Sequence, residues 1–71
     1  HVTKSPNPMI LTTEHIIDSD KRIVVAINHD TSSEELNPIL TDGWHEGKIY
    51  YGSKCISAND ACVFEVVRDD I

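Results

Sequence analysis

The chain has 71 residues, of which 39% are hydrophobic, and its twelve acidic and six basic side chains give a formal net charge of −6. A chain of this length forms at most one domain, and it buries only about 60% of the surface that its unfolded state exposes. The acidic excess argues against nucleic acid as a partner, because phosphate binding needs a concentrated positive surface.

The hydropathy pattern gives no indication of a membrane protein. No apolar run approaches the roughly 20 residues that a transmembrane helix needs, and no signal-peptide core is visible. We therefore expect no membrane partner and a cytoplasmic location, with secretion left open. Residues 1–8 are polar and contain two prolines, which predicts a flexible N-terminal arm ahead of a single α+β domain over residues 9–71.

Two strands are predicted after the arm. Residues 9–17 are rich in β-branched side chains, and residues 18–21 form a polar turn cluster. Residues 22–27 are almost continuously apolar, which favours a central strand covered at least partly on both faces. The register of this first hairpin stays open, because its four-residue turn can be drawn in more than one way.

A helix is predicted within residues 31–43. Thr31 and Ser32 are each followed three residues later by a glutamate, as in a capping box. The apolar residues that then recur at helical spacing are Leu36, Ile39 and Leu40. Pro38 leaves two alternatives, which are one helix from about Ser33 and a turn followed by a helix with Pro38 at its first position. Gly43 ends the helix in either case.

The last third of the chain predicts a second hairpin, with strands over residues 48–56 and 61–68 and a turn over residues 57–60. A turn centred between Ala58 and Asn59 places Cys55 opposite Cys62, and opposed residues share a face. The predicted core face holds Ile49, Tyr51, Cys55, Cys62, Phe64 and Val66. The predicted outer face holds Tyr50, Gly52, Lys54, Val63, Glu65 and Val67.

The element order β-β-α-β-β predicts an α+β two-layer sandwich, with a four-stranded, mainly antiparallel sheet and one helix on one face. A resemblance rests on Leu36, Leu40, Asp42, Gly43 and Trp44, followed by a strand with Tyr50 and Tyr51. In these residues the chain resembles small bacterial and phage domains of unknown function, whose leucine-rich helix ends in an acidic-Gly-Trp signature before a β-hairpin. Pro38 and the first hairpin depart from that pattern. The resemblance implies a compact, non-catalytic module and supplies no functional residues.

Few residues suggest chemistry. Cys55 and Cys62 are a possible disulfide if they face each other, and otherwise two small buried thiols. His45 lies beside Glu46 and near Asp42, where it could act as a base or weak metal ligand, although a solvated loop is the commoner role of such residues. No zinc motif, nucleophile elbow or phosphate loop is present. We expect no catalytic, metal-binding or cofactor-binding residue, and therefore no enzyme.

Binding is the function that the sequence favours. A single helix leaves one sheet face open, and this open face or a free strand edge would then pair with another copy or a protein partner. The candidate interface residues are Trp44, His45, Tyr50, Val63 and Val67. The acidic residues Glu34, Glu35, Asp42, Glu46, Glu65, Asp69 and Asp70 form either a negative surface that mimics nucleic acid or a solvated scatter.

The sequence therefore predicts a small, dimeric protein-interaction module. A phage or bacterial accessory protein that blocks a host factor is its most concrete form. The alternative is a ligand-binding protein whose subunit interface holds a nucleotide-like molecule between Trp44, His45 and Tyr50.

Overall fold

The computed structural model describes residues 1–69, and all the regular structure in this range is β. The predicted α+β class is therefore wrong. The eight strands are β1 (Thr3–Lys4), β2 (Ile10–Asp18), β3 (Lys21–Asn28), β4 (Glu34–Glu35), β5 (Ile39–Leu40), β6 (Trp44–Tyr51), β7 (Cys55–Ile56) and β8 (Ala61–Arg68).

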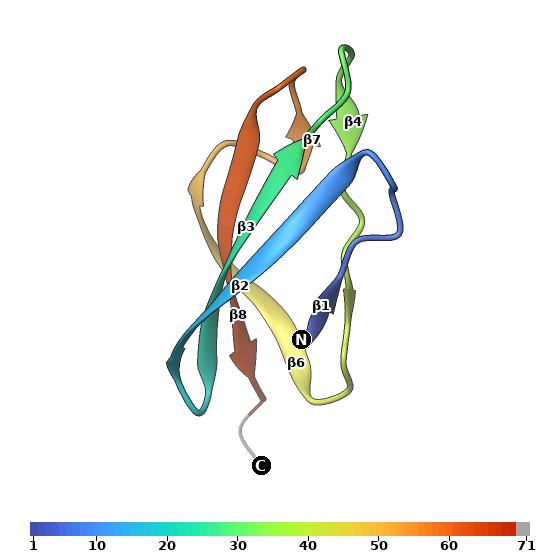
Figure 1. The fold of residues 1–71 in the computed structure, drawn as a ribbon. Coiled ribbons are helices and arrows are strands. Elements are labelled where there is room, and N and C mark those ends of the chain that lie inside the picture. The colour runs from blue at the N-terminus through green and yellow to red at the C-terminus, as the bar shows by residue number, and fades with distance from the viewer. Residues whose placement is uncertain (70–71) are drawn as a thin grey trace.

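The four long strands form one antiparallel sheet, the main sheet, in the order β2-β3-β8-β6 (Figure 1). The first predicted hairpin is confirmed as β2 and β3, with Leu11 opposite Ile27 and a register shift only near the turn, between Ile16 and Asp18. Strand β3 lies between β2 and β8, as its apolar sequence predicts. The predicted strand over residues 61–68 is β8.

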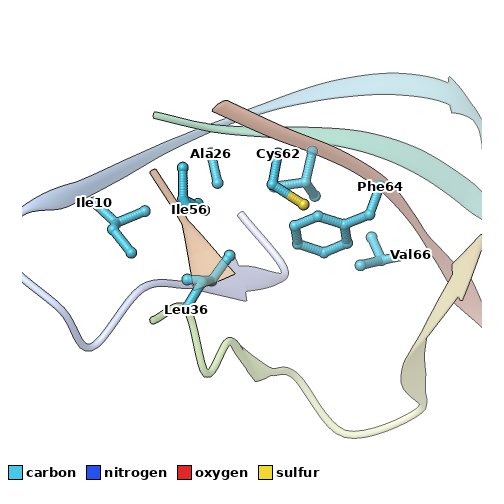
Figure 2. Packing of buried hydrophobic residues seen from close by; sticks show 8 residues of the cluster. Ile10, Ala26, Leu36, Ile56, Cys62, Phe64 and Val66 are labelled. Carbon is cyan, nitrogen blue, oxygen red and sulfur yellow. The ribbon is translucent and has the colours of Figure 1, made fainter. Parts of the chain in front are cut away.

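The four short strands form a second layer of two separate pairs, β1 with β5 and β4 with β7. The core lies between this layer and one face of the main sheet, which we call the inner face. Figure 2 shows the sheet residues of the core pointing toward Leu36 and Ile56 of the second layer. The buried hydrophobic residues are Ile10, Val24, Ala26, Leu36, Ile56, Cys62, Phe64 and Val66.

The predicted helix does not form, and its segment runs through β4 and β5 instead. The Leu36 amide donates to the Lys54 carbonyl, 2.8 Å away, so this backbone bonds to another segment rather than to itself. Two physical effects oppose the helix. Pro38 costs about 3 kcal/mol in a helix interior, and a helix of this length is marginal without a supporting apolar face. In the extended segment that forms instead, Leu36 is buried and Ile39 is 56% exposed, so its apolar residues point in different directions. The leucine-rich helix that the resemblance implies is therefore absent.

The N-terminal segment is also not the predicted flexible arm. Thr3 is 4% exposed and lies opposite Leu40 in the β1–β5 pair. The buried carboxylate of Glu14 accepts hydrogen bonds from the amides of Val2 and Thr3 and from the Arg22 guanidinium. Burial alone would raise the pKa of Glu14, but these donors outweigh it and lower the pKa below its ordinary value. One side chain of β2 thus anchors the start of the chain.

The second hairpin has a different register from the predicted one. The predicted first strand is divided at Gly52, whose φ is +74°, into β6 and β7. Strand β7 pairs with β4, so Cys55 lies opposite Glu35 rather than Cys62, and both thiols are free. The predicted turn at residues 57–60 is confirmed, with Asn59 at a φ of +56°.

This register changes the predicted core face. Cys62, Phe64 and Val66 are buried as predicted. The residues predicted beside them are exposed, namely Ile49, Tyr51 and Cys55. Lys54, predicted on the outer face, lies with its ammonium 4.5 Å from the centre of the Phe64 ring and pairs with Glu46.

Candidate functional site

The face of the main sheet opposite the core is the candidate site, and we call it the outer face. Successive side chains of a strand point to opposite sides, so the residues that alternate with the buried core residues belong to this face. They are Leu11, Thr13 and His15 of β2, Lys21, Ile23, Val25 and Ile27 of β3, and Ala61, Val63, Glu65 and Val67 of β8. The second layer packs on the inner face, as Figure 2 shows, so it leaves these side chains uncovered.

Apolar side chains extend across the outer face from one strand to the next. Leu11 is 60% exposed, its opposite residue Ile27 is 39% exposed, and Val25 lies opposite Val63 in the middle of the sheet. Tyr51 of β6 lies opposite Val63 and is 55% exposed. The result is a contiguous apolar surface rather than isolated exposed residues, and such surfaces mark interaction sites.

Glu65 is the polar centre of this surface. Its carboxylate accepts hydrogen bonds from the Lys48 amide at 3.0 Å and the Tyr50 hydroxyl at 2.8 Å, and the Lys21 ammonium is 3.7 Å away. The hydrogen bond from the Lys48 amide, and after it the one from the Tyr50 hydroxyl, hold the pKa of Glu65 below its ordinary value. The hydrogen bond to the same carboxylate raises the pKa of Tyr50. The charge of Glu65 is therefore matched by groups of its own chain.

Gly47 provides the room for this arrangement. A Cβ atom at Gly47 would lie 2.4 Å from Glu65 Oε1 and 2.5 Å from Glu65 Cγ, closer than atoms can approach. The register of β6 against β8 shifts between Glu46 and Ile49, next to this glycine. The Glu65 side chain thus lies over the β6 backbone, where it reaches the Lys48 amide.

The predicted interface residues do not form one cluster. Val63 and Val67 lie on the outer face, His45 is opposite Val67, and the Tyr50 hydroxyl reaches the same face through Glu65. Trp44 instead packs against the core on the inner side. The guanidinium carbons of Arg22 and Arg68 lie over its ring, 5.2 and 5.0 Å from the ring centre. Trp44 is therefore partly buried against the core rather than part of the outer face.

His45 has a different partner from those considered in the sequence. Its Nδ1 pairs with the Asp69 carboxylate, and both side chains are about half exposed. Glu46 pairs with Lys54. Within residues 1–69, no group of three or more histidine, cysteine, aspartate and glutamate side chains is arranged to hold a metal ion.

The acidic side chains do not gather on one surface. Glu34 accepts a hydrogen bond from Asn7, Glu46 contacts Lys54, and Glu65 contacts Lys21, in three separate parts of the fold. Asp70, which is one of the predicted acidic residues, lies outside the described residues. The solvated scatter is the interpretation that fits these positions.

The alternative pocket between Trp44, His45 and Tyr50 is predicted at a subunit interface, so it stays a prediction that one copy of the chain does not test. Three pockets of about 360, 260 and 180 Å³ lie beside residues 1–5, and none of the three is lined by those aromatic residues or His45. The largest is lined by residues 1–4 and 39–41. These pockets lie where the N-terminal segment packs against β2, β3 and β5.

Sequence reasoning missed Leu11, Val25 and Ile27 as surface residues. In the folded chain, their strands alternate between buried and less buried positions with a period of two. Val25 and Ile27 lie within an almost continuous apolar run, so that alternation is hidden in the sequence and becomes visible only in the burial of the folded chain.

Comparisons with protein-family models, curated proteins and solved structures gave no match. No helix in the described part of the chain is long and apolar enough to span a membrane.

Proposed function

We propose that the protein is a non-catalytic interaction module that binds another protein surface through the outer face of its main sheet. The observation that carries this proposal is the contiguous apolar surface over β2, β3 and β8, in which Leu11 and Ile27 are 60% and 39% exposed. Burial of apolar surface is favourable by roughly 25 cal/mol per Å², so covering these side chains provides the driving force for binding.

The polar groups of the outer face do not oppose its burial by a partner. The Glu65 carboxylate is already satisfied by the Lys48 amide, the Tyr50 hydroxyl and Lys21. A partner can therefore cover it without leaving an unpaired buried charge, which would be strongly unfavourable. The surface combines an apolar centre with charges that are paired within the chain.

Site-specific photo-crosslinking tests the proposal. A photoreactive amino acid at Ile27, on the outer face, is compared with the same amino acid at Ile39, which is 56% exposed but lies in β5 of the second layer. In the cells that make the protein, we expect defined protein adducts at Ile27, including adducts to a second copy, and few at Ile39.

Equal labelling at the two positions, or no adduct at Ile27, would contradict the proposal. Mass spectrometry of the adducts also tests the narrower hypothesis of an accessory protein that blocks a host factor. That hypothesis requires a host protein among the adducts at Ile27 and its absence at Ile39.

A further inference from the structure

We infer that the occupant of the outer face is a second copy of this chain, packed face to face about a two-fold axis. This inference rests on the proposed function of that face and adds the identity of the partner. Three features of the described residues support it, namely the size of the face, its distribution of charge and the condition of the sheet edges.

The outer face is large enough for a dimer. Strand β3 has eight residues, so the sheet is about 26 Å long at about 3.3 Å per residue. Its four strands span about 19 Å at about 4.8 Å per strand. The face therefore covers about 500 Å², and two copies together bury about 1,000 Å², the lower bound for a specific interface. Side-chain relief adds to this flat estimate.

The charge distribution permits contact between copies of an acidic chain. With a net charge of −6, two copies repel each other unless their acidic residues lie away from the contact. Each acidic residue of the outer face has a partner within its own chain. The Lys21 ammonium lies 3.7 Å from Glu65 near the middle of the face. At the two ends of β8, Asp60 accepts a hydrogen bond from the Tyr51 hydroxyl at 3.2 Å and Asp69 pairs with His45. Glu14 and Glu46 contact groups on the inner side.

The same distribution disfavours a basic partner. A basic surface would require exposed, unpaired carboxylates opposite it, whereas the outer face presents mainly Leu, Ile, Val and Tyr side chains. The chemistry that complements this face is another apolar surface of low charge. The outer face of a second copy has that composition.

The edges of the main sheet are less suited to pairing than its face. Strand β6 has register shifts on both sides of Ile49, and such bulges disrupt strand addition. On β2, the buried Glu14 side chain accepts hydrogen bonds from the amides of Val2 and Thr3, which holds the N-terminal segment next to this edge strand. Face-to-face contact is thus favoured over an extended sheet.

In the dimer, the two main sheets pack about 10 Å apart with their strands at about 30°. The contact is isologous, so the same side chains of both copies meet around the axis. Val25 and Val63 lie opposite each other in the middle of the face, where contact with the second copy is closest.

Sedimentation equilibrium of the purified full chain tests this inference, at concentrations up to about 100 μM, where a dissociation constant in the micromolar range is readily measured. We expect the wild-type chain to be a dimer. Val63→Lys and Ile27→Lys each place a charge in the contact and should weaken the dimer by at least about 100-fold. The matched control is Ile16→Lys, at a residue that is 69% exposed and faces the inner side beside Glu14 and Arg22. It should leave the dimer unchanged.

A wild-type chain that is monomeric at the highest concentration overturns the inference, as does a dimer that survives both outer-face substitutions. Circular dichroism and Trp44 fluorescence establish that each variant is folded. If Val63→Lys unfolds, Ile27→Lys decides the question, because the side chain it replaces is already 39% exposed. If the chain is a monomer but crosslinks to another protein at Ile27, the dimer is wrong and the proposed binding function of the outer face still holds. If the chain is a monomer and gives no such adducts, both the dimer and the proposed binding function are wrong.

Discussion

Asn28 provides the sharpest test of how the two layers are held together. It is fully buried at the end of β3. Its Nδ2 donates to the carbonyls of Ser32 and Ile56, at 2.9 and 3.0 Å, and lies 3.3 Å from the Ser57 carbonyl. Its Oδ1 accepts from the Asp30 amide at 2.8 Å. One side chain thus connects β3 to the loop after it and to the end of β7.

Asn28→Asp keeps the shape of this side chain but replaces its donor with an oxygen. Two carbonyls, those of Ser32 and Ile56, lose their donor and face a carboxylate instead. A buried polar group left without its partner costs about 1–3 kcal/mol, and the buried charge adds to this. We expect the free energy of unfolding to fall by about 3–5 kcal/mol at neutral pH. A chain of this length has about 4–10 kcal/mol in total, so the variant should be strongly destabilised or unfolded.

Urea denaturation followed by Trp44 fluorescence measures this loss. The matched control is Asn37→Asp, the same chemical change at an exposed residue, and it should shift the free energy of unfolding by no more than about 0.5 kcal/mol. If the two variants differ by less than about 1 kcal/mol, the hydrogen bonds of Asn28 do not stabilise the fold in the way described.

The pH dependence of Asn28→Asp gives a second measurement. Burial against carbonyl oxygens should raise the pKa of the introduced carboxyl group in the folded state above its unfolded value of about 3.9. The proton is then bound more tightly by the folded chain, so the destabilisation is fully present above the folded pKa and decreases as the pH falls through it. The difference from Asn37→Asp should therefore be smaller at about pH 4.5 than at neutral pH.

Three further substitutions test individual contacts by thermal or urea denaturation. The pKa of Glu14 is lowered in the folded chain from 4.5, so the stabilisation by its charged form is present above that value and is lost as the pH falls through the lower folded pKa. Glu14→Gln should lower the free energy of unfolding by about 2–4 kcal/mol at neutral pH. The stability of this variant should also depend less on pH in the acid range. Gly47→Ala should lower the melting temperature, because its Cβ would contact Glu65, and the loss should be smaller in a Glu65→Ala background. Gly52→Ala should destabilise more than Gly43→Ala: both have positive φ, but a Cβ at Gly52 lies 2.7 Å from a backbone oxygen and a Cβ at Gly43 meets no atom within 4 Å. Equal losses would contradict that steric argument.

The parts of the fold that the sequence predicts are those with many residues in one pattern. Strands β2, β3 and β8 have eight or nine residues each, enough β-branched and apolar side chains to show strand propensity without knowledge of their neighbours. The turns at residues 18–21 and 57–60 are visible from their polar residues for the same local reason. The placement of Val63 and Val67 on one side of β8 follows from alternation alone.

The tertiary structure decides the rest, because the remaining short strands have only two residues each. Such strands have no periodicity of their own, and they form because a partner supplies hydrogen bonds, as the Lys54 carbonyl does for Leu36 and the Val2 carbonyl does for Thr41. The capping-box pattern at Thr31 and Ser32 is a real local preference, but it concerns a segment that is extended in the fold and whose residue Leu36 fills the core. The open outer face follows from this outcome, since all the covering segments lie on the inner side. Local sequence determined the long strands β2, β3 and β8, and long-range pairing determined the ends of β6 and which face of the sheet is left uncovered.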